Sequence, residues 1–180
     1  KHLFMSTIVF LAVIFAAFIH SIWNGMIKKQ DDKYIAMAAL VLGHVPLSIV
    51  VIIITPMISL ESIPYIFLSG IFHAGYLWFL LLAYKFGDYT KVYPIARGSA
   101  PIFVSIVSLI FFAVVLSNFE LMGIVVISLG ILSLSFKDSR SIKNHKAIIY
   151  ALITGGFIMS YSITDGYGAK ISLSFLSYMG

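Results

Sequence analysis

Polar residues at helical spacing near the end of the first apolar stretch are candidates for binding chemistry. His20, Asn24 and Lys28 follow one another at intervals of four residues, and Trp23 lies beside them. On a helix these residues share one face. Because polar and ionisable side chains are costly in lipid, such a face usually lines a cavity or meets a partner. We predict that it lines a substrate pathway; the alternative is that Trp23 and Lys28 anchor the helix among the headgroups.

A second candidate is the pair Tyr93 and Arg97, four residues apart between Pro94 and Pro101. Proline removes a backbone donor and tends to kink a helix. If the helix begins near Tyr89, Arg97 lies about 12 Å along its axis at 1.5 Å per residue, too deep for easy solvation. Arginine can bind a carboxylate or phosphate through two parallel hydrogen bonds. The alternative is a structural arginine that pairs with an acidic residue or caps a neighbouring helix.

Tyr161 and Asp165 form a third candidate, again four residues apart, near the end of the last long apolar stretch. The carboxylate could accept a proton or pair with a cation along a substrate pathway. Since Asp165 approaches the expected membrane interface, a solvated loop position is the alternative.

Three further residues have simpler alternatives. His44 and His73 could relay protons, because histidine titrates near neutral pH; the alternative is a hydrogen-bonded packing role. Asp88 directly precedes an apolar stretch, where a carboxylate caps a helix and favours its dipole. We predict helix capping for Asp88.

The elements that position these residues are predicted by composition. Of 180 residues, 61% are apolar or aromatic and only 11% are charged, against about 25% charged in ordinary soluble domains; the mean hydropathy is +1.04. Continuous apolar stretches near the ~20 residues needed to cross a bilayer indicate helices rather than alternating barrel strands. We predict an all-α, polytopic transmembrane helical bundle with spans near residues 5–27, 34–55, 63–84, 89–116, 119–136 and 147–168.

Several functions are not supported by the sequence. Without cysteine there is no cysteine-based metal or redox site, and HExxH, GxSxG, Walker and GxGxxG motifs do not occur. We therefore expect no enzyme, no metal site and no cofactor. The formal charge of +5 comes from residues in the breaks between apolar segments, so we expect the lipid bilayer and a small metabolite as partners rather than nucleic acid.

Basic residues predict the orientation of these helices. Nine lie on the side of the first, third and fifth connections, whereas only Lys1 and Lys170 lie on the other. The positive-inside rule makes the lysine-rich side cytoplasmic and places the N-terminus outside. We read the first apolar stretch as a membrane helix rather than a cleaved signal, in a multi-pass protein of a bacterial cell (inner) membrane.

Small residues and an internal echo suggest how the helices pack. Gly156, Ser160 and Thr164 form a ridge that would allow close helix approach, and glycines 123 and 130 could do the same. FIHSIWNGMIKK, starting at Phe18, is echoed by FIMSYSITDGYGAK, starting at Phe157. A repeat of five helices inverts its second copy, and two copies need roughly 280 residues. We therefore expect a first repeat in residues 1–137, a basic loop in 138–146, and the truncated start of a second repeat in 147–180.

The segment GDYTKVYPIARGSAPIFVSIVSLIFF from Gly87, followed by Glu120 and by GIVVISLGIL from Gly123, resembles the EamA-type branch of the drug/metabolite transporter (DMT) superfamily. The motifs HSIWN with Lys28 and YSITD with Gly166 are similar to the family's first and sixth helices. The resemblance implies ten helices in two inverted repeats, and transport of a small metabolite by alternating access through the cavity between them. Against that pattern, we expect this sequence to stop short of helices eight to ten and of most of the seventh. The alternatives are a lipid-linked-group flippase of the same superfamily and a non-transporting membrane interaction subunit.

Overall fold

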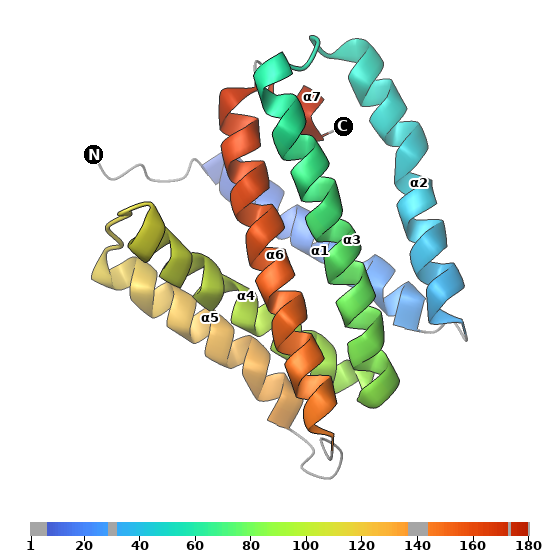
Figure 1. Ribbon diagram of the computed structural model, residues 1–180, viewed down its shortest axis with the longest axis vertical. Coiled ribbons are helices and arrows are strands. Elements are labelled where there is room, and N and C mark those ends of the chain that lie inside the picture. Colours follow the sequence, from blue (N-terminus) through green and yellow to red (C-terminus); the bar gives the residue numbers. More distant parts are fainter. Residues whose placement is uncertain (1–6, 29–31, 137–143, 173, 180) are drawn as a thin grey trace. The chain divides into compact units, whose positions relative to one another are not determined.

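The computed structural model is helical throughout its described parts, which are residues 7–28, 32–136, 144–172 and 174–179 (Figure 1). Side chains at positions 20, 23–25, 27, 28, 33, 34, 37, 40 and 179 are also outside the description. The elements are α1 (Thr7–Lys28), α2 (Lys33–Ile54), the 3-10 turn η1 (Leu60–Ser62), α3 (Ile63–Phe86), α4 (Tyr89–Phe111), α5 (Asn118–Phe136), α6 (His145–Ile171) and α7 (Phe175–Met179). No strand occurs among the described residues.

The helices divide into two compact units. One holds α1 and α2, and the other holds the chain from Thr55 to Met179. Four helical stretches of the second unit are long and apolar enough to cross a membrane: Leu60–Phe86, Tyr89–Phe111, Asn118–Ser135 and His145–Ile171. In α1 and α2 the described residues include shorter apolar stretches, Thr7–Ile19 and Val41–Ile54. These helices support a membrane protein and confirm the all-helical prediction.

The starts of three helices are stabilised by local side chains. Asp88 occupies the N-cap position of α4, where its Oδ1 accepts hydrogen bonds from the backbone N–H and the hydroxyl of Thr90 at 2.8 and 2.7 Å. Ahead of α5, Ser117 and Glu120 bond reciprocally, since Glu120 Oε2 accepts from the Ser117 N–H and the Ser117 hydroxyl accepts from the Glu120 N–H. Asn144 caps α6. These bonds satisfy donors that every helix start leaves open.

The predicted helix bounds agree with the structure within three residues, except at the end of α4. The apolar sequence predicted a helix to residue 116, but α4 ends at Phe111. There the Ser108 carbonyl accepts from the N–H groups of both Phe112 and Val114, and Ala113 adopts a left-handed φ of 49°. Hydropathy missed this stop because the linker is as apolar as the helix before it.

In the second unit, α6 packs along α3 and α4, and α5 packs against α4 (Figure 1). The contact of α4 with α6 is close because small residues meet there. A Cβ atom at Gly155 would overlap the Ser99 hydroxyl and lie 3.0 Å from the Ala96 carbonyl oxygen. At Gly156, 123 and 130, by contrast, the described chain has no atom within 4 Å of a Cβ. The close approach is thus one residue before the ridge predicted through Gly156.

Charged side chains of the second unit gather at opposite ends of its helices. The α3–α4 connection and the start of α6 share one end, where Lys85, Lys91 and Lys146 lie. The end of α5 reaches the same place, because the Ser135 hydroxyl donates to the Lys91 carbonyl oxygen at 2.8 Å. The other ends carry Glu61, Glu120, Asp165 and Lys170. Within this unit the lysine-rich connections therefore lie at one end of the helices, as the sequence predicted. Residues 138–143 of the basic loop lie outside the described residues.

Candidate functional site

Arg97 lies in the middle of α4, where its side chain is held by the tyrosine one turn earlier. Its Nε donates a hydrogen bond to the Tyr93 hydroxyl at 3.2 Å, and its guanidinium carbon lies 5.5 Å from the centre of the Tyr93 ring. Tyr93 stacks on Tyr89 with ring centres 5.5 Å apart, and Tyr89 contacts Tyr84 of α3 at 4.9 Å. The four-residue spacing of Tyr89, Tyr93 and Arg97 places all three on one face of the helix.

A second aromatic group from α3 and α6 completes the surroundings of Arg97. The His73 and Tyr161 rings stack with centres 3.9 Å apart, and the Tyr76 ring lies 5.9 Å from that of Tyr161. Tyr76 and Tyr161 both interact electrostatically with Arg97. His73 Nδ1 lies 3.0 Å from the Ser69 carbonyl oxygen and 3.2 Å from the Ser69 hydroxyl oxygen, so the ring is held from within α3. Three helices thus converge on one guanidinium; we name Arg97, Tyr93, Tyr76, Tyr161 and His73 the arginine cluster.

The arginine of the cluster has no carboxylate partner among the residues that the structure describes. Within the described parts of the chain, no carboxylate oxygen lies within the 4.0 Å of Arg97 that defines an ion pair. The residues that interact with it are tyrosines. This disfavours the alternative of a structural arginine paired to an acidic residue of these parts.

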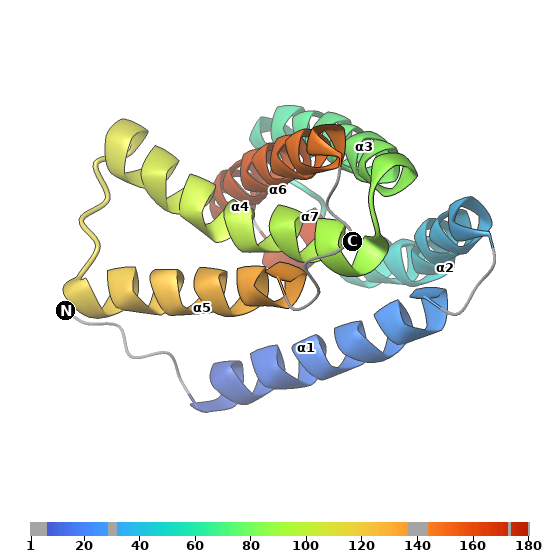
Figure 2. The same ribbon diagram turned by 90° about the horizontal axis from the view of Figure 1, so that it is seen from below.

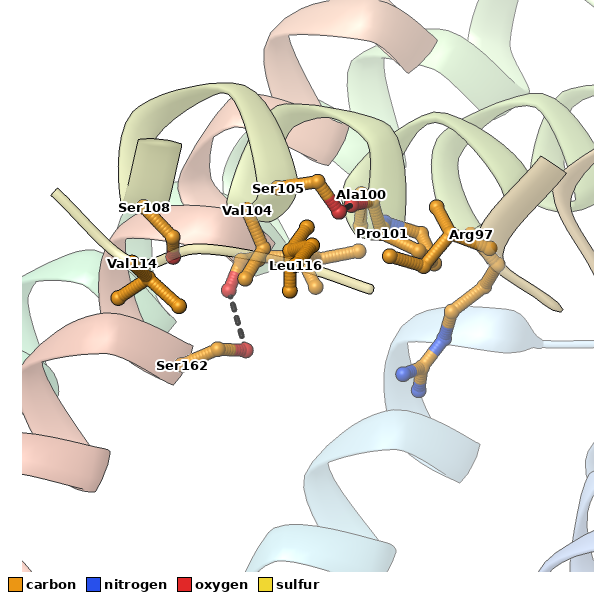
Figure 3. A pocket seen from close by; sticks show the side chains of 11 residues that line it. Arg97, Ala100, Pro101, Val104, Ser105, Ser108, Val114, Leu116 and Ser162 are labelled. Carbon is orange, nitrogen blue, oxygen red and sulfur yellow. Dashed lines mark hydrogen bonds between the residues drawn. The ribbon is translucent and has the colours of Figure 1, made fainter. Parts of the chain in front are cut away.

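An open cavity of about 420 Å³ extends from Arg97 along α4. Figure 3 shows Arg97 at one end of the lining and Ser108 with Val114 at the other. The wall between them is largely aliphatic and comes from α4, α5, α6 and the α4–α5 linker. It consists of Ala100, Pro101, Val104, Ser105, Leu116, Ile124, Ile158 and Ser162.

Two serines of the cavity wall have already used their hydroxyl protons. Ser105 donates to the Pro101 carbonyl oxygen and Ser162 to the Ile158 carbonyl oxygen, both at 2.7 Å. The second bond is the dashed line that ends at Ser162 in Figure 3. A hydroxyl that donates its proton retains acceptor lone pairs. These serines can therefore accept hydrogen bonds from a ligand, whereas the charged donors of the cavity are those of Arg97.

Asp165 lies one turn beyond Tyr161 on α6 but faces a different space. Its Oδ1 accepts a hydrogen bond from the Tyr178 hydroxyl at 3.2 Å. It lines a second cavity of about 320 Å³ together with Gly166, Ala169, Lys170 and Phe175. Tyr161 interacts electrostatically with both Arg97 and Asp165. The predicted pair is therefore split, with Tyr161 in the arginine cluster and Asp165 at the next opening along α6.

The structure does not test the predicted roles of the residues in the first unit. His20, Trp23, Asn24 and Lys28 belong to α1, but their side chains are outside the described residues. His44 is exposed on α2. The polar face of α1 therefore stays a prediction, as does a proton-relay role for His44.

Sequence reasoning missed part of the arginine cluster and most of the cavity. Tyr89 was foreseeable, because it precedes Tyr93 and Arg97 at the same four-residue spacing. Tyr76 follows His73 by three residues and so shares its helix face. The serines of the cavity carried no signal, because isolated serines are common in membrane helices and only the packing of α4 against α6 brings them together.

Comparison with known proteins does not assign this chain to a family. The chain matches no protein-family model, and comparisons with curated proteins and solved structures found no significant match. The functional argument for this chain is therefore carried by its own geometry: a half-buried arginine that interacts with tyrosines, at the end of a largely aliphatic cavity among apolar helices.

Proposed function

We propose that this protein is a secondary carrier that moves a small metabolite across a membrane by alternating access, in the manner of EamA-type transporters. The sequence motifs around Gly87 and Arg97 support the family, and the four long apolar helices support a membrane setting. In this proposal the second repeat completes a central pathway, and the polar face of α1 contributes to it. The protein is multi-pass, with its lysine-rich end in the cytoplasm.

The observation that carries the proposal is Arg97, a charge held among apolar helices without a carboxylate partner in the described chain. An ionisable side chain in the middle of a membrane helix costs at least ~2.5 kcal/mol. A purely structural role would be served by a nearby carboxylate or by an apolar residue. An arginine beside an open cavity instead has donors free for a passing solute, and its guanidinium has five in total.

The helix that carries Arg97 also suggests how the pathway could change shape. Pro94 and Pro101 lie inside α4, one on each side of Arg97. Each proline lacks the N–H that would close a helical hydrogen bond, which lowers the resistance of the helix to bending. We propose that α4 bends at these points during alternating access and moves Arg97 between the two sides.

The test is efflux from proteoliposomes loaded with a defined mixture of small metabolites, read by mass spectrometry. The protein is purified as its own membrane contains it, so that every segment of the natural chain is present. At least one compound should leave faster than from protein-free liposomes, and Arg97→Ala should remove most of that difference. Lys85→Ala is the matched control, because it removes the same charge from an exposed position. Equal efflux with and without protein would refute a carrier.

The aliphatic cavity wall also favours the alternative of a lipid-linked-group flippase, since acyl chains fit such a wall. Its test uses the same proteoliposomes with fluorescent lipids in place of soluble metabolites. If lipid scrambling or flipping depends on Arg97 and no metabolite leaves the liposomes, the protein is a flippase and not a metabolite carrier.

A further inference from the structure

We infer that the cavity beside Arg97 binds a monocarboxylate with an apolar body. This inference rests on the proposed carrier function and specifies its substrate class. It follows from three properties of the described residues: the charge of the arginine cluster, the position of its donors, and the lining of the cavity that begins there.

The charge of the arginine cluster selects a monoanion. Arg97 supplies one positive charge, and the groups that interact with it are neutral tyrosines. A carboxylate bound there gives a neutral pair. A phosphate dianion or a dicarboxylate would leave one negative charge without a partner among apolar helices, which is costly. A cationic ligand would meet a like charge.

The geometry of Arg97 suits a planar carboxylate. Its Nε is fixed by the Tyr93 hydroxyl, so the guanidinium is held in one orientation. The terminal NH2 groups remain the forked donors that match two carboxylate oxygens. Tyr161 interacts with the same guanidinium, and its hydroxyl can act as a hydrogen-bond donor as well as an acceptor.

The cavity wall determines the rest of the ligand. Leading away from Arg97, the cavity is lined by Ala100, Pro101, Val104 and Ile158. An aliphatic or aromatic body gains about 25 cal/mol for each Å² of apolar surface that it buries there. The Ser105 and Ser162 oxygens accept but do not donate, because their protons are used. They tolerate a hydroxyl or amide N–H on the body and disfavour a second carboxylate.

The experiment measures binding to the full-length protein in zwitterionic phosphatidylcholine nanodiscs. The probes are hexanoate, its neutral isostere hexanamide, its cationic counterpart hexylamine, and the dianion succinate. We expect hexanoate to bind, and the other three to bind at least tenfold more weakly. Charged hydrogen bonds contribute about 1.5–3 kcal/mol, so Arg97→Gln should weaken hexanoate binding about 10- to 100-fold. Lys85→Gln, which removes an exposed charge, should leave the affinity unchanged.

A second pair of variants tests the apolar part. Val104→Phe fills the cavity and should weaken hexanoate binding much more than acetate binding, because acetate needs only the guanidinium. Val125→Phe adds the same volume on the exposed face of α5, where Val125 is 52% exposed, and should change neither. Both variants must give the same unfolding profile as the parent protein, so that a folding defect is not mistaken for a filled cavity.

Other results would overturn the inference. Equal binding of hexanoate and hexanamide would show that the charge is not used, and tighter binding of succinate would show that the site takes a dianion. If phosphatidic acid added to the nanodiscs binds in an Arg97-dependent way and hexanoate does not, the anion is a lipid headgroup. The carrier function and the monocarboxylate substrate can be refuted independently of each other. Hexanoate binding without efflux refutes the carrier alone, whereas Arg97-dependent efflux of a cation or a neutral solute refutes the monocarboxylate alone.

Discussion

The close contact of α4 with α6 can be tested by adding one methyl group at Gly155. In Gly155→Ala the new Cβ would overlap the Ser99 hydroxyl and lie 3.0 Å from the Ala96 carbonyl oxygen. The carbonyl belongs to the helix backbone and can give way only if the helices separate. Overpacking of this kind costs about 1–3 kcal/mol. The replacement also gains up to about 1 kcal/mol of helix propensity, which would mask part of the cost in a single variant.

Gly156→Ala separates these two effects. It is the adjacent position on α6, it gains the same helix propensity, and the described chain has no atom within 4 Å of its new Cβ. The difference between the two variants therefore isolates the packing cost, and we expect Gly155→Ala to be less stable by about 1–3 kcal/mol. Ser99→Ala should recover part of this loss by removing the nearest atom. The assay is reversible unfolding in detergent or bicelles. Variants that differ by less than about 0.5 kcal/mol, or no recovery by Ser99→Ala, would refute the close contact.

Two further predictions concern side-chain hydrogen bonds, and a third concerns the backbone conformation of one residue. Asp88→Ala should lower the free energy of unfolding by about 0.5–2 kcal/mol because α4 loses its N-cap, whereas Asp88→Asn should retain most of it, as measured by the same unfolding assay. Ala113→Gly should stabilise the α4–α5 linker by up to about 1 kcal/mol, because glycine adopts the left-handed φ of 49° without penalty; a destabilised variant would contradict this. Ser135→Ala should cost about 0.5–1.5 kcal/mol through the lost bond to the Lys91 carbonyl, and hydrogen exchange should rise at the α4 start.

The sequence predicted the helices well because lipid imposes a simple requirement. A chain that crosses hydrocarbon must satisfy its backbone within helices, so length and hydropathy alone located the elements to within a few residues. The prediction of where α4 ends was wrong for the same reason. Residues 112–116 are apolar but not helical, and hydropathy cannot separate an apolar linker from a helix. The stop is marked by the left-handed backbone at Ala113 and by the two bonds to the Ser108 carbonyl oxygen, and hydropathy reports neither.

Of the candidate site, the sequence predicted only the contacts between residues of one helix. Tyr93 and Arg97 lie one turn apart on one helix, so their contact follows from spacing alone. Tyr161 and Asp165 have the same spacing, but Tyr161 interacts with Arg97 in the arginine cluster, whereas Asp165 lines the second cavity. Neighbours on a helix face share a direction, whereas which cavity they meet depends on the helices packed against them. The absence of a carboxylate near Arg97 within the described residues is likewise a tertiary fact.

The cavity and the close helix contact occupy adjacent faces of α4. Gly155 brings α6 against the Ala96 turn of α4, and Figures 1 and 2 show α4 running away from α6 toward its C-terminal end. The next residues along α4, beginning with Arg97, line the cavity, as do Ile158 and Ser162 on α6. The same contact also reaches Ser99 and Phe103 of α4, so it spans the stretch of helix that contains Arg97. Arg97, Pro101 and Val104 lie on the adjacent face of α4 and line the cavity. The small residue at position 155 therefore permits close packing on one face of α4, while the arginine lies on the face that borders the cavity.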